Sequence, residues 1–272
     1  MIVGGGGNVT YESLLEAANE GNESAQFTIG MMYLNGDKVD QDFKTALEWF
    51  LKAANQGNSR AQYNLGIMHE FGDGVAQDNA KAIEWYTKAA EQNYVDAMMN
   101  IGNIYLRENS GCHDFTKAFE WYMKAANLGD SDAQYNIGSM YLHGQGGVER
   151  DTKKALEWYS KSAEQGDCAT QCRIGLMYVQ GEGGVEVDYK SAMEWFIRAA
   201  NHGYPTAQYN IGLMYNNGFG VDVDYQQAME WYLKAAKHGH QMAAQNIAVL
   251  YHNGQGVEKD EEKAKEWFAK SH

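Results

Sequence analysis

The sequence predicts an all-α protein, an α/α solenoid of seven helix-turn-helix units that follow one N-terminal helix. Three observations predict this fold. A tryptophan recurs seven times at a nearly constant step, an aspartate precedes each of these tryptophans by seven residues, and a glycine or asparagine follows six of them by eight. A step of roughly 20–50 residues is typical of repeat architectures.

The tryptophans define the repeat. They are Trp49, Trp85, Trp121, Trp158, Trp195, Trp231 and Trp267, at spacings of 36, 36, 37, 37, 36 and 36 residues. Each longer spacing coincides with an additional glycine, at Gly146-Gly147 and Gly183-Gly184, so the inserted residue belongs in a loop. We expect each tryptophan to pack in the core between the helices of its own unit, since large aromatic side chains dominate protein cores.

The second helix of each unit, here called helix B, contains the tryptophan and covers about residues 43–56 in the first copy. Aspartate is a good N-cap because its carboxylate accepts the unpaired N–H groups of the first turn. A glycine just past the end accepts the left-handed conformation that closes a helix. The aspartates are Asp42, Asp78, Asp114, Asp151, Asp188, Asp224 and Asp260, and the closing residues are Gly57, Asn93, Gly129, Gly166, Gly203 and Gly239.

The first helix of each unit, helix A, reads AQYNLGIMHEF from Ala61 and AQYNIGLMYNN from Ala207. A glycine recurs within it at Gly30, Gly66, Gly102, Gly138, Gly175 and Gly212. Glycine inside a helix costs about 1 kcal/mol relative to alanine, so its return in each copy predicts a close approach of another helix. The single proline, Pro205, falls at the start of a helix A, where its missing N–H costs nothing.

Both ends of the array are predicted from residues that depart from the repeat pattern. The segment from Tyr11 aligns with helix B and gives a lone helix before the first pair. Two residues before the tryptophan, six copies are apolar and the seventh has Lys265, which we expect to mark the solvated end of the stack. We therefore predict one solenoid domain over residues 9–272, preceded by a flexible glycine-rich segment, residues 1–8, in which Gly4 to Gly7 resemble a linker.

The composition excludes several functions. With 22 basic and 36 acidic residues the net charge is −14, which disfavours binding to nucleic acid or to an anionic membrane. No apolar run is long enough to span a bilayer, and the N-terminus does not resemble a signal peptide. Three cysteines do not suggest a disulfide framework. We expect a cytoplasmic monomer without cofactor or bound metal.

The repeated pattern A-x-x-x-L/I-G-x-M-Y-x-x-G-x-G-V-x-x-D-x-x-x-A-x-E-W-Y-x-K-A-A resembles the Sel1-like repeat family, a relative of the tetratricopeptide repeats. The resemblance covers nearly the whole chain, and the third copy departs most, since its loop from Arg107 lacks the usual glycine pair. It implies a right-handed superhelix and a scaffold or adaptor that binds a protein or peptide on its concave face. The chain lacks the paired cysteines of a secreted branch of the family.

The candidate partner-binding residues lie in two adjacent columns of helix A, because helix A lines the concave surface in related solenoids. They are Tyr63, Asn64, Asn100, Tyr135, Asn136, Arg173, Tyr209 and Asn210. The asparagines have two interpretations: they bind the backbone of a partner, or they bond to the neighbouring repeat. Arg173 replaces asparagine in one copy and suits a ligand carboxylate. Helix B offers seven Glu–Lys or Glu–Arg pairs at i,i+4, which we expect to form a solvated face.

Catalysis finds little support in the residues. Cys168 and Cys172 lie one helical turn apart, but no second pair completes a metal site. Cys112 and His113 are adjacent, and adjacent side chains seldom point at each other. We therefore predict an interaction scaffold and no enzyme. The alternative is a regulatory or targeting module of a larger signalling enzyme; a hydrolase is the third and least favoured reading.

Overall fold

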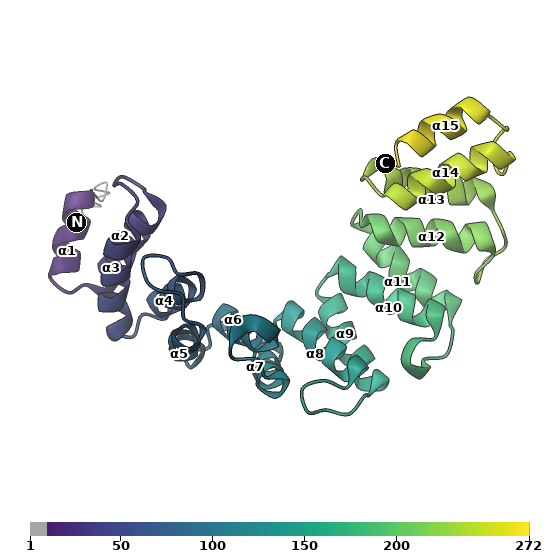
Figure 1. The fold of residues 1–272 in the computed structure, drawn as a ribbon. Helices are drawn as coiled ribbons and strands as arrows, with labels where there is room; N and C mark the ends of the chain where they lie inside the picture. Colours follow the sequence, from purple (N-terminus) through teal and green to yellow (C-terminus); the bar gives the residue numbers. More distant parts are fainter. Residues whose placement is uncertain (1–9, 272) are drawn as a thin grey trace, which may run out of the picture. The chain divides into compact units, whose positions relative to one another are not determined.

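The computed structural model describes residues 10–271, and within them the chain forms fifteen α-helices and no strand (Figure 1). The predicted glycine-rich segment, residues 1–8, lies outside the described residues. Contacts divide the chain into two compact units, Met1–Leu128 and Gly129–His272, which we describe separately. The prediction of a single domain remains a prediction.

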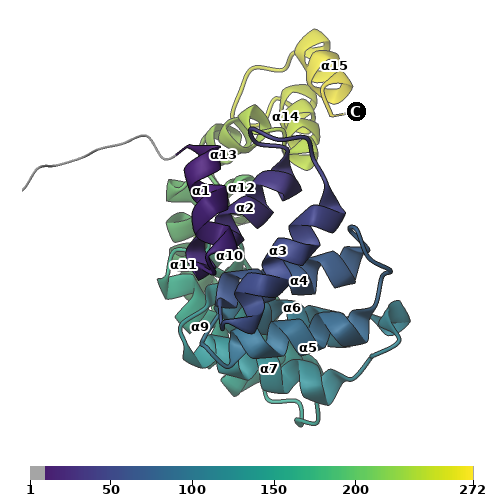
Figure 2. The same cartoon turned by 90° about the vertical axis from the view of Figure 1, so that its left-hand side faces the viewer.

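The first unit holds the lone N-terminal helix and three helix pairs. α1 packs against α2, and each helix A then packs most extensively against the helix B that follows it (Figure 2). The helices are α1 (Tyr11–Asn19), α2 (Glu23–Asn35), α3 (Phe43–Asn55), α4 (Ser59–Phe71), α5 (Asn79–Ala90), α6 (Val95–Leu106) and α7 (Phe115–Asn127). A 3₁₀ turn, Glu108–Ser110, occupies the irregular loop of the third copy.

The second unit holds four helix pairs with the same alternation. Its helices are α8 (Ser131–His143), α9 (Thr152–Glu164), α10 (Cys168–Gln180), α11 (Tyr189–Asn201), α12 (Pro205–Asn217), α13 (Tyr225–Lys237), α14 (Gln241–Asn253) and α15 (Glu261–Ala269). A second 3₁₀ turn, Glu182–Gly184, contains the glycine inserted in the fifth copy. The predicted all-α solenoid of seven pairs after one helix is confirmed.

The predicted helix ends are confirmed in detail. All seven aspartates accept backbone N–H groups of the first turn of helix B; Asp42, for example, accepts from Lys44 at 3.0 Å. The closing glycines have positive φ, and Asn93, the one substitute, has φ 62°. Pro205 begins α12, as expected. Local sequence therefore determines where each helix starts and stops.

The recurring glycine of helix A marks a close approach to an aromatic ring. The residue after the tryptophan packs its ring on this glycine, and a Cβ at Gly66 would lie 2.4 Å from Tyr86. These rings are almost fully buried in six copies: Phe50, Tyr86, Tyr122, Tyr159, Phe196 and Tyr232. In the seventh copy Ala248 stands at the glycine position, and Phe268, the equivalent ring, is 56% exposed.

The tryptophans themselves are less buried than predicted. Only Trp49 counts as buried, and the other six are half-buried. Trp85 packs against a core cluster that includes helices of the preceding copy, so it does not serve its own unit alone. The buried position in each pair is that of the residue after the tryptophan, because its ring packs on the recurring glycine of helix A. The prediction that the tryptophans form the core was therefore only partly right.

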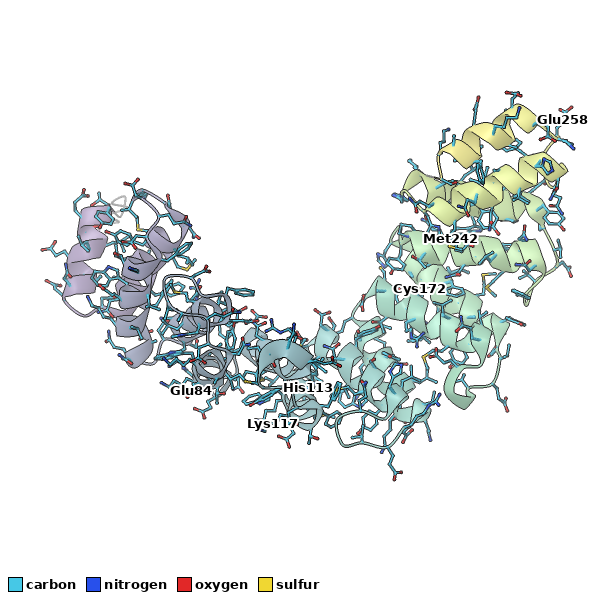
Figure 3. The ribbon with its side chains drawn as sticks, viewed as in Figure 1. Glu84, His113, Lys117, Cys172, Met242 and Glu258 are labelled. Carbon is cyan, nitrogen blue, oxygen red and sulfur yellow. The ribbon has the colours of Figure 1, made fainter. Side chains whose placement is uncertain are left out.

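The basic residue of the predicted Glu–Lys pairs lies on the tryptophan. In all seven copies its cationic group lies 3.7–4.5 Å from the centre of the ring of the tryptophan three residues earlier, as a cation–π contact. Over residues 10–271 none of the seven i,i+4 pairs forms a salt bridge, and Glu84 is exposed (Figure 3). The i,i+4 pairs therefore do not form ion pairs, but the predicted solvated face of helix B is confirmed, because the glutamates and bases of all seven copies are exposed.

Side-chain amides connect neighbouring copies. Gln62 on α4 donates to the carbonyl of Ala54 at the end of α3, and its own oxygen accepts from Gln92 at 2.8 Å. The first copy and the fourth, in the second unit, have the same glutamine pair. In the third copy both glutamines are replaced, by Met98 and Leu128, so that a polar connection becomes an apolar one.

The glycine–ring contact predicts an unusual response to substitution. Alanine stabilises most exposed helix positions relative to glycine by about 1 kcal/mol. We expect Gly212→Ala to destabilise the protein by about 1–3 kcal/mol, because its Cβ would lie 2.5 Å from the Tyr232 ring. Urea unfolding followed by circular dichroism measures the effect. In a Tyr232→Leu background the same alanine should cost less; an equal cost in both backgrounds would show that the ring is not the cause.

Candidate functional site

Two candidate residues of the first unit, Tyr63 and Asn100, belong to one hydrogen-bonded group. Tyr63 on α4 is half-buried, and its ring stacks on Tyr94 with centroids 4.9 Å apart. Asn100 on α6 donates to the hydroxyl of Tyr63 at 3.4 Å and to that of Tyr86 at 3.1 Å. Burial, with the nearby Asp96 carboxylate, raises the pKa of Tyr63, so its hydroxyl remains neutral at physiological pH.

A buried carboxylate extends this group. Tyr86 donates to Glu70 Oε2 at 2.7 Å, and Arg107 Nη2 lies 2.5 Å from Glu70 Oε1. The Glu70 side chain is only 8% exposed, so this ion pair satisfies a charge that would otherwise be costly. Burial and the Glu70 carboxylate raise the pKa of Tyr86, which keeps its proton in the bond. Arg107 and Glu70 thus join the third copy to the second.

The asparagine column mainly connects copies to each other. Asn100 reaches Tyr63 of the preceding copy, and Asn210 donates to Cys172 Sγ of its preceding copy at 3.7 Å. Asn64 instead donates to the carbonyl of Arg60 in its own helix. These contacts favour the structural interpretation of the column, with side chains rather than backbone as the partners.

In the second unit, Tyr135 and Arg173 remain half-buried on helix A. The Tyr135 ring lies 5.2 Å from that of Tyr159, and Asn136 beside it is also half-buried. Arg173 Nη2 donates to Glu182 Oε1 at 2.8 Å, and this bond, with the Glu182 charge, outweighs burial and raises the pKa of the guanidinium. A ligand carboxylate at Arg173 would therefore compete with Glu182.

Tyr209 and Asn210 lie deeper than the other candidate residues. They are 8% and 9% exposed, and the Tyr209 ring stacks on His240 with centroids 4.4 Å apart. Tyr209 also packs on Tyr232 of its own pair, and Asn210 bonds to Cys172 of the preceding copy, which leaves little surface for a partner. The six half-buried candidates, three in each unit, are Tyr63, Asn64, Asn100, Tyr135, Asn136 and Arg173.

A pocket between α2 and α4 involves residues that sequence reasoning missed. Its volume is about 420 Å³, and it is lined by Ser24, Phe27, Thr28, Met31, Asn58 and Arg60. The guanidinium of Arg60 lies 4.5 Å over the Phe27 ring. Phe27 and Thr28 begin the two predicted columns, and Arg60 lies one helical turn before Asn64. Residues one turn apart lie on the same face of a helix, so helical periodicity could have identified Arg60 as a candidate.

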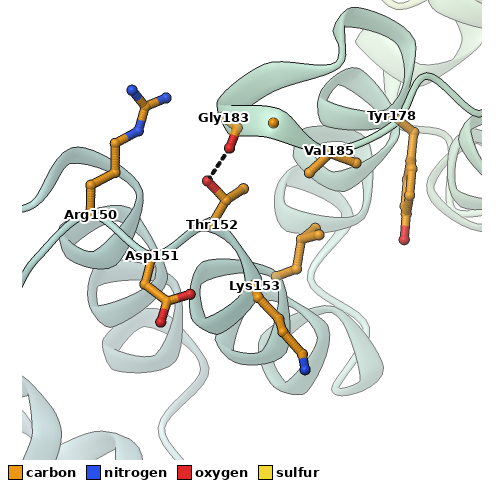
Figure 4. A pocket seen from close by; sticks show the side chains of 9 residues that line it. Arg150, Asp151, Thr152, Lys153, Tyr178, Gly183 and Val185 are labelled. Atoms are coloured by element: carbon orange, nitrogen blue, oxygen red, sulfur yellow. Dashed lines mark hydrogen bonds between the residues drawn. The ribbon is translucent and has the colours of Figure 1, made fainter.

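A larger pocket lies in the second unit, between the start of α9 and the loop after α10 (Figure 4). It measures about 790 Å³, and Thr152 donates across it to the carbonyl of Gly183 at 2.7 Å. Asp151 is occupied as the N-cap of α9. The lining lacks a nucleophile paired with a base, so this pocket offers no catalytic chemistry that the side chains indicate.

The buried cysteine, Cys172, is a poor nucleophile at neutral pH. Burial raises the pKa of the Cys172 thiol to about 11, and all three cysteines are free. In the part of the chain that the structure describes, no group of three or more His, Cys, Asp or Glu side chains is placed to hold a metal ion. Among the same residues, no helix has the length and apolar character needed to cross a membrane.

Comparison with known proteins agrees with this geometry. The sequence profile described as Sel1 repeat matches residues 23–58, 59–94, 95–130, 131–167, 169–204, 205–240 and 241–271. No curated protein matches the chain.

Two solved structures resemble it over nearly its full length. A protective antigen of uropathogenic Escherichia coli strains, which displays the Sel1-like repeat fold, is 35% identical with a TM-score of 0.86, over 97% of this chain and 56% of that one. A Sel1 repeat protein from Oxalobacter formigenes is 35% identical with a TM-score of 0.80, over 96% of this chain and 75% of that one.

The N-cap residue of α14, His240, predicts that the stability of the protein depends on pH. His240 Nδ1 accepts the backbone N–H of Ala243 at 3.3 Å, which requires a neutral ring, and burial lowers the pKa of His240. Below about pH 6.5 the unfolded histidine binds a proton that the folded one resists, so the free energy of unfolding falls as the pH drops below that value.

We expect His240→Asn to reduce the loss of stability between pH 7 and pH 5, because asparagine caps α2 and α4 in the same way without titrating. Urea unfolding at both pH values measures this difference. His69, whose pKa burial also lowers, stays in both proteins and serves as a constant background. An unchanged pH dependence in the variant would rule out His240 as its source.

Proposed function

Since this chain belongs to the Sel1 repeat family, whose members are generally protein-interaction modules, we propose that it is a scaffold or adaptor that binds a protein or peptide partner on its helices A. The observation that carries the proposal is the pocket between α2 and α4, where the exposed Arg60 of one helix A lies over the buried Phe27 ring of the preceding one.

The residue types on helix A suit an interface. Tyr63 and Tyr135 are half-buried, so each ring is held in place while part of it stays accessible. Tyrosine and arginine are the usual anchors of protein interfaces, because they offer a large contact area. Arg60 and Arg173 add two fixed cations, which suit acidic groups of a partner.

The opposite face, formed by helix B, is a poorer candidate. Its seven bases lie on tryptophan rings and its glutamates are exposed to water, with the same arrangement in every copy. A surface that repeats without variation offers little to distinguish one partner from another. Helix A varies from copy to copy at the corresponding positions, as Tyr63, Met99 and Tyr135 show.

The comparison also limits what is carried over to this chain. It spans 56% of the length of the E. coli antigen, so the role of that whole protein is not transferred. The alternative, a regulatory or targeting module of a larger signalling enzyme, stays open beside the scaffold. A cytoplasmic location and a monomeric state remain predictions.

Substitutions on the two faces should separate them. We expect Tyr135→Ala and Arg173→Ala each to weaken binding of the partner by about 1–2 kcal/mol, the loss typical of an interface hot spot. Lys124→Ala and Lys161→Ala should have little effect, because each removes one exposed cation from the surface of helix B. The partner is captured on the immobilised chain, identified by mass spectrometry and titrated by calorimetry.

Helical content of every variant is checked by circular dichroism, so that loss of binding is not loss of fold. If the lysine variants lose affinity while the Tyr135 and Arg173 variants keep it, helix B is the working surface and the proposal is wrong.

A further inference from the structure

The pocket at the start of α9 combines apolar and cationic side chains (Figure 4). Its volume of about 790 Å³ lies within the range of roughly 300–1,000 Å³ that is typical of ligand sites. Leu156, Tyr178 and Val185, all half-buried, form its apolar part, and the exposed Arg150 and Lys153 line it as well. Because a loop and the start of a helix B form this pocket, it is separate from the helix A columns.

The first residue of helix B fills the equivalent space in other copies. Tyr225, the first residue of α13, packs against a core cluster that Tyr251 and Val257 of the next copy also contact. Tyr251 and Val257 correspond to Tyr178 and Val185 of the pocket. The first residue of helix B is aromatic in four copies, as Phe43, Phe115, Tyr189 and Tyr225.

In the fourth copy Thr152 stands at this position. Its hydroxyl donates to the carbonyl of Gly183 at 2.7 Å, and its side chain is much smaller than an aromatic ring. By contrast, the ring of Tyr189 at the start of α11 stacks on Phe219 in the loop of the next copy, with centroids 5.1 Å apart. The pocket therefore includes the space that a ring fills in other copies, and an aromatic ring is the group that fits it.

The fourth copy also differs in charge around this position. It is the copy with a lysine or arginine both two residues before and one residue after the first residue of helix B, as Arg150 and Lys153. Among the described residues neither cation forms a salt bridge. Asp151, the acidic residue of the lining, accepts from the backbone of Lys154 and lies 3.5 Å from Lys154 Nζ, so its charge is compensated locally. The two unpaired cations favour an anionic ligand.

We propose that this pocket binds a segment of a partner protein in which an aromatic residue stands between acidic residues. The ring enters the space beside Thr152, Tyr178 and Val185, where it replaces the ring that other copies supply themselves. Arg150 and Lys153 bind the flanking carboxylates. Since these two side chains diverge (Figure 4), acidic residues on both sides of the ring fit them better than one small anion does. The inference does not depend on the helix A surface.

The probe is a labelled peptide in which one phenylalanine stands between two pairs of glutamates, and fluorescence anisotropy measures its binding to the full chain. We expect saturable binding that weakens as salt is added, because salt screens exposed charges. Arg150→Ala and Lys153→Ala should each weaken binding by about two- to fivefold, the effect of an exposed ion pair. Thr152→Tyr should weaken it by about tenfold or more, because the introduced ring takes the place of the phenylalanine.

Matched variants define the site. Thr152→Val also loses the hydrogen bond to Gly183 but adds no ring, so it should bind the peptide more tightly than Thr152→Tyr does. Lys190 has the same position in α11 as Lys153 in α9, but Tyr189 precedes it, so Lys190→Ala should leave binding unchanged. Peptides with glutamine for glutamate, or alanine for phenylalanine, should bind more weakly than the probe. Circular dichroism checks the fold of every variant.

The absence of saturable binding would overturn the proposal, and so would equal binding by the Thr152→Tyr and Thr152→Val variants. Equal effects of Lys190→Ala and Lys153→Ala would show that the lysine acts through general charge and not at this pocket. If Tyr135→Ala loses the peptide while Thr152→Tyr keeps it, the peptide binds the helix A surface, and the proposal for this pocket is wrong.

Discussion

The contact between an aromatic ring and a glycine determines the distance between the two helices of nearly every pair. Because the Tyr86 ring sits where a Cβ of Gly66 would be, α4 and α5 approach more closely than two ordinary helices could. The ring turns the preceding tryptophan toward the edge of the interface, where it is half-buried and receives a lysine on its face. The glycine on helix A thus determines which residues of helix B are buried, which lie at the edge of the interface and which face solvent. In the seventh copy, Ala248 replaces this glycine and the equivalent ring, Phe268, is exposed.

The contacts that join one copy to the next are more variable than those within a pair. Glutamine pairs join the first copies, but Met98 and Leu128 replace one pair together, and a buried Glu70–Arg107 ion pair appears beside that change. In the second unit, His202 and His238 stand at the position where the first copies have the glutamine that donates the hydrogen bond. The buried side-chain oxygens of Gln171 and Gln208, which would accept this bond, have no partner among the described atoms. The differences between copies therefore arise where one copy meets the next.

The helices could be predicted because their ends depend on residues close in sequence. The contacts of the side chains were harder to predict, because they depend on residues that are close only in space. Asp42 and Gly57 fixed the ends of a helix, because capping involves only residues within a turn. The glycine column predicted a close approach for the same reason. The i,i+4 rule failed for Glu48 and Lys52, because it ignores the Trp49 ring beside the lysine. Arg173 was singled out correctly as an exception, but its partner Glu182 lies in a loop that no helical period describes.

The distinction between repeated and variable positions has a consequence for how such a chain recognises other proteins. A repeated position, such as the cation on each tryptophan, makes the same contact in every copy, so it gives a partner little that distinguishes one copy from another. A variable position on helix A is constrained only where it meets the next copy, as Asn210 meets Cys172. Such positions differ from copy to copy, as Tyr63, Met99 and Tyr135 do, so a partner that binds helix A would meet a different set of side chains in each copy.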